Sequence, residues 1–290
     1  MRRPLAVVLT AVAAALTTLA GTALSAPAVA ADPAPLRYVA LGDSYSAASG
    51  VLPLKPLAPL PCLRSQRNYP SVIAERTAAT LRDVTCGGAD TGDYRAAQYP
   101  GVPPQLSALR SDTQLVTMTI GGNDSGVFVG AITKCGSEGL RTLGQGNPCQ
   151  RRYGSSFEDT IRTTTYPALV QALQDVRAAA PQARVAILGY PWIVPASGSC
   201  FPQLPVARGD VPYLRSLQTT LNDAVRRAAE ATGATYVDLS TVSEGKDACK
   251  SVGVRWVEPV VGTTNAVVVH PNARGERGMA DHTMAVLGLG

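Results

Sequence analysis

The sequence predicts an α/β fold with a mostly parallel five-stranded sheet, and two observations carry this prediction. Short apolar runs alternate with longer helical patterns along the chain, which is the signature of βαβ units. The chain has 290 residues, and 290 − 31 = 259 remain once an N-terminal targeting segment is set aside. That length suits one large domain with a well-buried core better than two small ones.

Five strands are expected, and each ends near glycine or small polar residues. The strongest is QLVTMTIGGND at 114–124, which is rich in β-branched residues and closes on a glycine pair. The others are RYVALGDS at 37–44, RDVTCGG at 82–88, ARVAILGYP at 183–191 and ATYVDLST at 234–241.

Helical patterns lie between these strands. They are expected at 69–81, at 103–112, from about 157 to 180, at 211–232 with Gly233 as the stop signal, and at 273–288. Three long stretches are expected to be irregular, namely 51–67, 134–152 and 192–210, and each contains cysteine. Loops of this length are usually functional or tied down, and disulfides would tie them here.

The N-terminus has the pattern of a secretory signal peptide. A cationic start, Met1-Arg2-Arg3, precedes the uncharged run 5–24 and a small-x-small site at 28–30. We therefore expect residues 1–31 to be removed and residues 32–290 to form one secreted, extracellular domain. A membrane anchor is the alternative, but Gly21 and Pro27 interrupt the run, and no later stretch is long and apolar enough to span a bilayer.

Cysteine usage points to disulfides rather than to metal. An even number of cysteines in an exported chain favours three disulfides, because an oxidising compartment lets them persist. The chain has no Cys-x-x-Cys pair and only two histidines, so no metal site is expected. Six cysteines allow fifteen pairings. We expect the sequential pairing, which closes the shortest loops: Cys62 with Cys86, Cys135 with Cys149, and Cys200 with Cys249.

The charge balance excludes a nucleic-acid partner. The formal net charge of +5 falls to +3 when the two arginines of the targeting segment are removed. The remaining basic residues are diffuse, with isolated pairs such as Arg151-Arg152 and no run interleaved with aromatic residues.

Four short blocks carry residues that together can do chemistry. Ser44 follows the first expected strand, Gly88 the second and Asn123 the third, while His270 precedes the last helix. Residues at the carboxyl ends of parallel strands converge where the strand order reverses. A serine needs an imidazole to take its proton, and acyl transfer needs donors aimed at the oxyanion. The backbone N–H groups of Ser44 and Gly88 and the amide of Asn123 would supply three donors.

These blocks, LGDSYSAASG, CGGAD, GGND and His-Pro-Asn in this order, resemble those of the SGNH (GDSL) hydrolases. Within that superfamily the signal peptide, six cysteines and length resemble the secreted actinobacterial esterases and lipases. The resemblance implies a flavodoxin-like three-layer α/β/α sandwich. It also implies Ser44 as nucleophile, His270 as base, an oxyanion hole of Ser44, Gly88 and Asn123, and no cofactor.

Two neighbouring residues invite other interpretations. Asp43 is interpreted as a structural residue that caps the loop before Ser44 rather than as a catalytic acid. His282 is the rival base, next to Asp281, but it lies twelve residues beyond His270 and inside the expected last helix. It should therefore lie more than three turns away from the loop. Adjacent helix residues also do not face each other.

The block around His270 departs from the pattern of the family. An aspartate usually stands three residues before the histidine, and here Val267 occupies that position. Some secreted actinobacterial members use a main-chain carbonyl instead, so the resemblance favours a Ser44–His270 dyad. The carbonyl of Val267 or Val268 would then accept the His270 Nδ1 proton. A carboxylate from elsewhere, such as Glu258 or Asp238, is the competing arrangement.

The sequence therefore predicts a secreted serine carboxylester hydrolase (esterase or lipase) for lipid or acylglycerol esters. It is expected to be a monomer with at most transient contact with lipid interfaces. Phospholipid acyl hydrolysis and carbohydrate deacetylation remain alternatives, as does a non-catalytic binding protein. The segments 51–63, 127–129 and 192–194 would either line an apolar acyl groove or pack the disulfide-tied loops.

Overall fold

The fold is built on a five-stranded sheet in which every strand pair is parallel, in the order β2-β1-β3-β4-β5. This computed structural model describes Met1 and residues 34–289, so the expected signal peptide lies outside the described residues. The strands are β1 (Arg37–Ala40), β2 (Thr80–Asp83), β3 (Leu115–Met118), β4 (Arg184–Leu188) and β5 (Thr235–Val237). The predicted parallel α/β architecture is confirmed.

The strand order fixes where a site can form. From β1 the chain adds β2 on one side and then crosses to add β3, β4 and β5 on the other. At such a reversal the connections leave the sheet in opposite directions, and a crevice opens at the carboxyl ends of the two central strands. Those strands are β1 and β3, which lead to Ser44 and Asn123 respectively.

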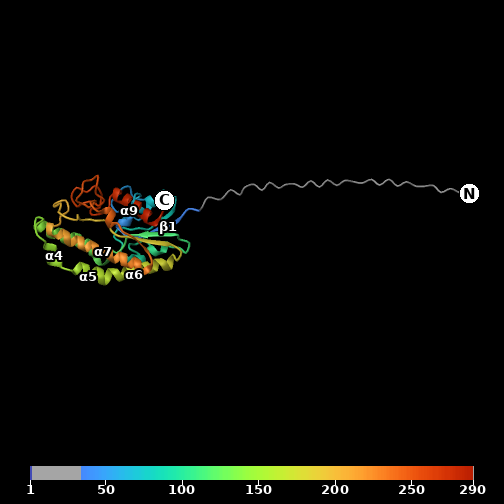
Figure 1. The fold of residues 1–290 in the computed structure, drawn as a ribbon, viewed down its shortest axis with the longest axis horizontal. Helices are drawn as coiled ribbons and strands as arrows, with labels where there is room; N and C mark the ends of the chain where they lie inside the picture. Colours follow the sequence, from blue (N-terminus) through green and yellow to red (C-terminus); the bar gives the residue numbers. More distant parts are fainter. Residues whose placement is uncertain (2–33, 290) are drawn as a thin grey trace. The chain divides into compact units, whose positions relative to one another are not determined.

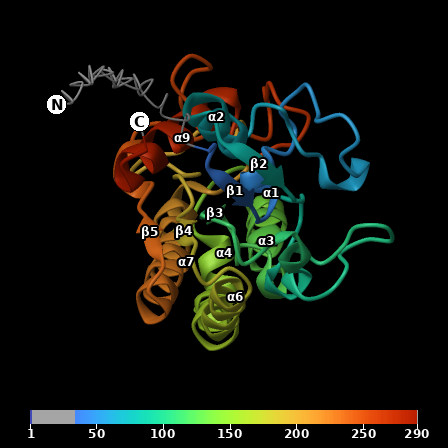
Figure 2. The same cartoon turned by 90° about the vertical axis from the view of Figure 1, so that its right-hand side faces the viewer.

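Helices cover both faces of the sheet and complete a three-layer sandwich. Helices α2 (Tyr69–Thr77) and α9 (Ala273–Leu287) pack together on one face, and α6 (Tyr166–Ala179) and α7 (Val211–Thr232) pack together on the other. Figures 1 and 2 show the sheet between these two layers. Each face has its own apolar core, because the central strands β1, β3 and β4 are buried on both sides.

The remaining elements are mostly short and lie in the connections. They are α1 (Ser44–Ala47), α3 (Val127–Arg141), α4 (Pro148–Tyr153), α5 (Ser156–Thr160), α8 (Ser240–Ser243), a π-helical turn (Ile161–Thr165), and 3₁₀ turns at Leu60–Cys62, Thr91–Tyr94, Gln105–Ala108, Asp124–Gly126 and Arg208–Asp210. Residues Pro35–Gly290 form one compact unit. No helix in the described part of the chain is long and apolar enough to cross a membrane.

Four expected elements need correction. The short helix expected at 103–112 is only a 3₁₀ turn at Gln105–Ala108. The second strand lies at Thr80–Asp83 rather than at 82–88, because the chain turns at Ala78 in a left-handed conformation and pairs with β1 at once. The stretch 134–152 is not irregular but contains the end of α3 and all of α4. Glycines hid α3 from the sequence pattern, since glycine disfavours helix. One of them, Gly139, is required because a Cβ there would lie 2.2 Å from the Pro205 carbonyl oxygen.

The helix expected from about 157 to 180 is interrupted. Residues 161–165 adopt a π-helical turn between α5 and α6. Pro167 lies in the first turn of α6 and has no N–H to donate to the preceding turn, so regular α-helical hydrogen bonding cannot pass through this point.

All six cysteines form disulfides, and the pairing is the sequential one expected from the sequence: Cys62–Cys86, Cys135–Cys149 and Cys200–Cys249. The first joins the long loop after α1 to the loop after β2. The second joins α3 to α4, and the third joins the 192–210 segment to the loop after α8. The connections around the carboxyl ends of the strands are therefore held by covalent links.

Candidate active site

Ser44 and His270 lie in contact at the carboxyl end of β1. Ser44 begins α1, and Gly42 supplies the sharp turn before it with a φ of 123°. A side chain at Gly42 would meet the Thr119 carbonyl oxygen at 2.4 Å, so the turn requires glycine. The Ser44 Oγ lies 2.8 Å from the His270 Nε2. A serine and an imidazole at this separation are placed for proton transfer.

A main-chain carbonyl orients the imidazole. The His270 Nδ1 lies 2.8 Å from the carbonyl oxygen of Val268. Because a carbonyl only accepts, Nδ1 carries the proton and Nε2 presents its lone pair to the hydroxyl of Ser44. Val269, between the two, has a φ of 57°, which is rare for a β-branched residue. This conformation turns the chain back, so that the carbonyl oxygen of Val268 comes within hydrogen-bond distance of the His270 side chain.

The imidazole is nearly buried and packs among aromatic rings. His270 is 9% exposed, and its ring lies 5.2 Å from that of Tyr45 and 6.0 Å from that of Phe128, measured between centroids. Burial lowers the pKa of His270 below its usual value, and the hydrogen bond to Val268 offsets this only in part. The imidazole is therefore neutral, as a base must be, at neutral pH and below it.

Tyr45 and Glu258 hold the loop that carries His270. The Tyr45 hydroxyl donates to the Val269 carbonyl at 2.8 Å, which fixes the unusual peptide from the side of α1. The backbone of Glu258 pairs with the same loop, since its N–H donates to the His270 carbonyl and its carbonyl accepts from Val269 N–H, both at 3.0 Å.

Neither of the competing carboxylates contacts the imidazole. The Glu258 side chain is fully buried and accepts from Arg255, from the Asn272 amide and from Thr264 N–H. Burial acts to raise the pKa of Glu258, but these hydrogen bonds prevail and hold it below its usual value. Asp238 is exposed and accepts from Ser240 N–H. The structure thus places the Val268 carbonyl, rather than that of Val267 or a carboxylate, on His270.

Asp43 braces the nucleophile loop, as expected of a structural residue. Its Oδ1 accepts from Tyr45 N–H and from the Thr119 hydroxyl, and its Oδ2 accepts from the Tyr190 hydroxyl at 2.5 Å. Tyr190 in turn accepts from Gly122 N–H, so this network joins the ends of β1, β3 and β4. Burial raises the pKa of Asp43 to about 6 against the effect of its hydrogen bonds.

The loops that carry Gly88 and Asn123 are tied together. The Asn123 side-chain amide donates to the Ala89 carbonyl at 2.9 Å, and Asp124 accepts from both the backbone N–H and the hydroxyl of Thr91. An amide NH₂ has two hydrogens, so Asn123 keeps one donor for a substrate. Gly88 is exposed with a φ of 78°. Within residues 34–289, its backbone N–H and that of Ser44 donate to no other protein group.

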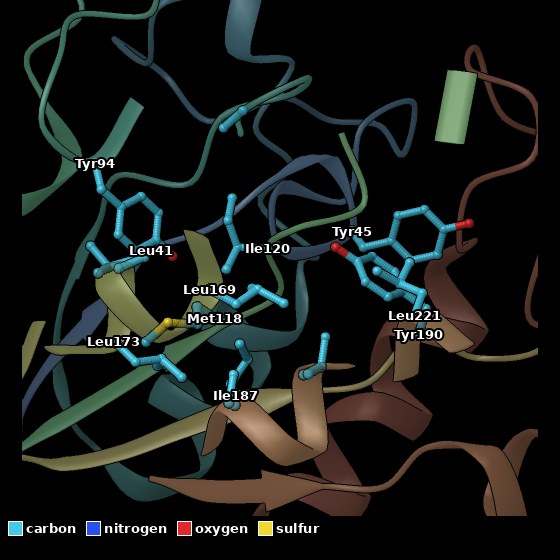
Figure 3. Packing of buried hydrophobic residues seen from close by; sticks show 14 of the residues in the cluster. Leu41, Tyr45, Tyr94, Met118, Ile120, Leu169, Leu173, Ile187, Tyr190 and Leu221 are labelled. Atoms are coloured by element: carbon cyan, nitrogen blue, oxygen red, sulfur yellow. The ribbon is translucent and has the colours of Figure 1, made fainter. Parts of the chain in front are cut away.

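Sequence reasoning missed several supporting residues. Tyr45 and Tyr190 lie side by side at the edge of the core, with ring centroids 5.1 Å apart (Figure 3). Their aromatic character is visible in the sequence, but their partners lie 224 and 147 positions away along the chain. The rival base His282 lies within α9, and no hydrogen bond links it to Ser44 among the described residues.

An apolar cavity of about 80 Å³ lies near the imidazole, although His270 does not line it. Phe128 and Val269 lie in its wall, which brings it next to His270. The polar atoms of Tyr190 and Gln218 in the wall already have hydrogen-bond partners. The lining comes from α3, α7, the connections between them and the segment before α9: Val127, Phe128, Ala131, Ile132, Gly136, Ile161, Tyr190, Ile193, Val194, Leu204, Pro205, Val206, Leu214, Leu217, Gln218, Leu221, Val260 and Val269.

Only part of the expected groove lines this cavity. Phe128 and Ile193 do, with their neighbours Val127 and Val194, whereas Val129 is exposed. Trp192 instead packs under the Arg215 guanidinium, 3.7 Å from the ring centroid. No residue of the leucine- and proline-rich segment 51–63 lines the cavity.

The chain matches known proteins over nearly its whole length. A model of the GDSL-like Lipase/Acylhydrolase family matches residues 40–277. The chain is 61% identical over 289 residues to Lipase 2 of Streptomyces coelicolor, which covers 97% of both chains. It is 30% identical over 259 residues to a lipase of Streptomyces rimosus, with 89% of this chain and 87% of that protein covered.

Solved structures of two Streptomyces proteins are also similar. Phospholipase A1 from Streptomyces albidoflavus NA297 superimposes with a TM-score of 0.72 at 29% identity, over 87% of this chain and 97% of the other. The extracellular lipase from Streptomyces rimosus gives a TM-score of 0.71 at 28% identity, over 87% and 99%.

The pKa of His270 provides a first prediction. Because burial depresses this pKa and no carboxylate raises it, the imidazole should gain its proton only at a pH below 6.5. Proton NMR of the unliganded protein should show this midpoint, and His282→Gln would remove the second imidazole signal. Activity should persist below pH 6.5 and fall only when His270 is protonated. A midpoint above 7 would indicate an anionic partner and would contradict the carbonyl arrangement.

The carboxylates provide a second prediction. Asp238→Asn should leave kcat/KM within about threefold, since losing a genuine triad acid costs about a thousandfold or more. Glu258→Gln should lower the free energy of unfolding, by up to about 3–5 kcal/mol, because it leaves buried Arg255 without its counter-charge. Its kcat per folded molecule should stay within about tenfold. Measuring kcat together with denaturant unfolding separates a loss of catalysis from a loss of folded protein. A thousandfold loss of kcat in either variant would refute the dyad.

Proposed function

Because the chain belongs to the GDSL-like lipase/acylhydrolase family, we propose that it hydrolyses carboxylic esters through an acyl-enzyme on Ser44. The observation that supports this most directly is the 2.8 Å contact between Ser44 Oγ and His270 Nε2, with Nδ1 held by a carbonyl. No step of this chemistry requires a cofactor, since the nucleophile and the base are both side chains.

The reaction proceeds in two halves. The hydroxyl of Ser44 attacks the ester carbonyl carbon while His270 Nε2 takes its proton, and His270 then returns this proton to the leaving alcohol. Water next attacks the acyl-enzyme, gives its proton to His270, and releases the acid as the proton returns to Ser44. The neutral Nδ1–H tautomer is required at the start of each half.

The oxyanion of each tetrahedral intermediate would be stabilised by neutral donors. We assign this role to the backbone N–H groups of Ser44 and Gly88 and to the free hydrogen of the Asn123 amide. Their loops are cross-linked by the bonds to Ala89 and Asp124, so the donors are held in place before substrate binds. Preorganised donors of this kind contribute about 10²–10³ each to the rate.

The apolar cavity beside His270 indicates the substrate class. A lining whose polar atoms are all satisfied internally is suited to an alkyl chain and offers nothing to a sugar. We therefore propose esters of longer acyl chains, such as acylglycerols, as substrates, with phospholipid acyl esters as the second candidate. The second candidate is favoured by the similarity to a protein named phospholipase A1. The cavity disfavours deacetylation of polysaccharides.

The cellular setting is also a proposal. Three disulfides and the signal-like N-terminal segment support secretion to the extracellular medium, where disulfides persist. The domain would act there as a monomer, because a single chain supplies the nucleophile, the base and the oxyanion donors.

Hydrolysis of p-nitrophenyl esters from acetate to palmitate tests the proposed function. The protein with its disulfides intact should turn over these esters, and Ser44→Ala should lose at least about a thousandfold in kcat, because it lacks the nucleophile. Asn123→Ala should lose about 10²–10³ in kcat with KM little changed. Equal rates for the parent and Ser44→Ala would refute the serine mechanism and favour the non-catalytic binding protein.

A substitution in the cavity tests the assignment of the acyl site. Gly136 lies in the cavity wall on α3, and a Cβ there would come no closer than 3.6 Å to another residue. Gly136→Leu should fill the cavity and lower kcat/KM for palmitate at least about tenfold relative to acetate. Gly130→Leu, on the same helix but outside the cavity, is the control and should leave this ratio unchanged. A parallel loss for all chain lengths would place the acyl chain elsewhere.

A further inference from the structure

The exposed apolar side chains are concentrated on two loops. After Met1, seven of the eleven exposed large apolar residues of the described chain lie within 51–63 and 250–268. Leu57 is fully exposed at the tip of its loop, with a φ of 62°. We call this surface the aliphatic rim and define it by these residues: Leu52, Leu57, Leu60, Val252, Val254, Val261 and Val268.

The two loops lie side by side and are held in place. The Gly50 carbonyl accepts from Ala266 N–H at 3.1 Å, and a side chain at Gly50 would meet the backbone of Val267 at 2.6 Å. Figure 2 shows the blue segment after α1 beside the red segments that precede α9. Within the first loop, Leu54 bridges to Ser65. The leucines are therefore displayed by a fixed loop rather than by a flexible tail.

Each of the two rim loops is connected to a loop of the candidate active site. Its first loop is joined to the Gly88 loop through the Cys62–Cys86 disulfide and through the hydrogen bond from Gly87 N–H to the Cys62 carbonyl. Its second loop ends at Val268, whose carbonyl orients His270. A surface that contacts the rim would therefore lie close to the loops that carry Gly88 and His270.

Two exposed basic residues lie beside the rim, Arg67 and Arg274. The other basic residues of segments 51–67 and 250–274 are paired with acids: Lys55 and Arg64 with Asp83, Lys250 with Asp247, and Arg255 with Glu258. Arg67 and Arg274 line one depression of about 350 Å³ together with Leu52 and Val252. Neither guanidinium has a salt-bridge partner within residues 34–289.

We propose that the aliphatic rim, with Arg67 and Arg274, docks this protein onto an anionic lipid surface. Projecting aliphatic side chains flanked by cations suit a layer with acyl chains below and negative headgroups above. A protein partner would be expected to meet aromatic residues at the centre of the surface, and the rim contains none. The inference rests on the proposed function in one respect, because docking would serve to bring lipid esters to Ser44. Docking itself requires no catalysis.

Vesicle sedimentation tests docking independently of hydrolysis. The Ser44→Ala protein would be mixed with phosphatidylcholine vesicles with or without phosphatidylglycerol. It should bind the phosphatidylglycerol vesicles, more weakly in high salt, and should bind pure phosphatidylcholine at least about tenfold more weakly. Absence of binding to the anionic vesicles, or equal binding to both, would overturn the proposal.

Matched variants distinguish binding through the rim from binding through any exposed apolar side chain. Leu57→Asp with Leu60→Asp, and Arg67→Glu with Arg274→Glu, should each weaken binding to anionic vesicles at least about tenfold. Leu140→Asp with Leu143→Asp alters two exposed leucines at the end of α3 and should bind as the parent does. An equal loss in this control pair would overturn the rim assignment.

A soluble substrate keeps this test apart from that of the proposed function. With Ser44 intact, both rim variants should hydrolyse p-nitrophenyl acetate at the parent rate, because none of the four altered residues belongs to the catalytic machinery. They should lose activity on emulsified long-chain esters. If the parent itself hydrolysed no ester, the proposed function would fail while vesicle binding still decided the docking proposal. A loss of activity on the soluble ester would indicate a folding defect, which circular dichroism would detect. The milder variant Arg67→Gln with Arg274→Gln would then decide whether the arginines contribute to vesicle binding.

Discussion

The hydrogen bond between His270 Nδ1 and the Val268 carbonyl is the constraint on which the rest of the site depends. It selects the tautomer, and the tautomer decides whether Ser44 meets a lone pair or a proton. The bond is local, since donor and acceptor are two residues apart, and it exists only because Val269 adopts a positive φ. Tyr45 and the backbone of Glu258 hold that conformation from two sides, so elements distant in sequence stabilise a local bond.

A carbonyl in this position differs physically from a carboxylate. A carboxylate raises the pKa of the imidazole and stabilises the imidazolium by a full charge, but it loses this effect when it is protonated in acid. A carbonyl offers only a dipole, so burial prevails and the pKa of His270 falls. The orientation of the imidazole then does not depend on the ionisation of its partner. The proposed oxyanion donors are likewise neutral, so the site would act through dipoles. The carboxylate beside Ser44 in the sequence, Asp43, instead hydrogen-bonds to residues at the ends of β1, β3 and β4.

The sequence pattern was sufficient for the parallel α/β architecture and for the order of the chemical blocks, because both depend on local pattern. It also indicated that the residues after the strands would converge, whereas the roles of Ser44 and His270 were implied by the resemblance to the family. It was not sufficient to choose between Val267 and Val268, because that choice depends on the φ of one residue. Helix α3 was missed because its glycines disfavour helix, although one of them, Gly139, is required by close contact with the Pro205 carbonyl, so tertiary packing overrode local propensity. Tyr190 was missed because its partner, Asp43, is 147 residues away.

The leucines of segment 51–63 show that a leucine-rich sequence can form either the lining of a buried groove or an exposed apolar surface. The sequence favoured two roles for them, lining an acyl groove or packing a loop. In the structure no residue of this segment lines the cavity, and Leu52, Leu57 and Leu60 are exposed. The loop is already held by the Cys62–Cys86 disulfide, so it loses little conformational entropy when its side chains enter a lipid layer. Inserting Leu57 into lipid therefore costs less free energy than it would if a flexible loop had to be ordered first. The same covalent link fixes the loop that carries Gly88. One disulfide therefore holds both the loop of the proposed oxyanion donor Gly88 and the surface that would deliver the ester to it.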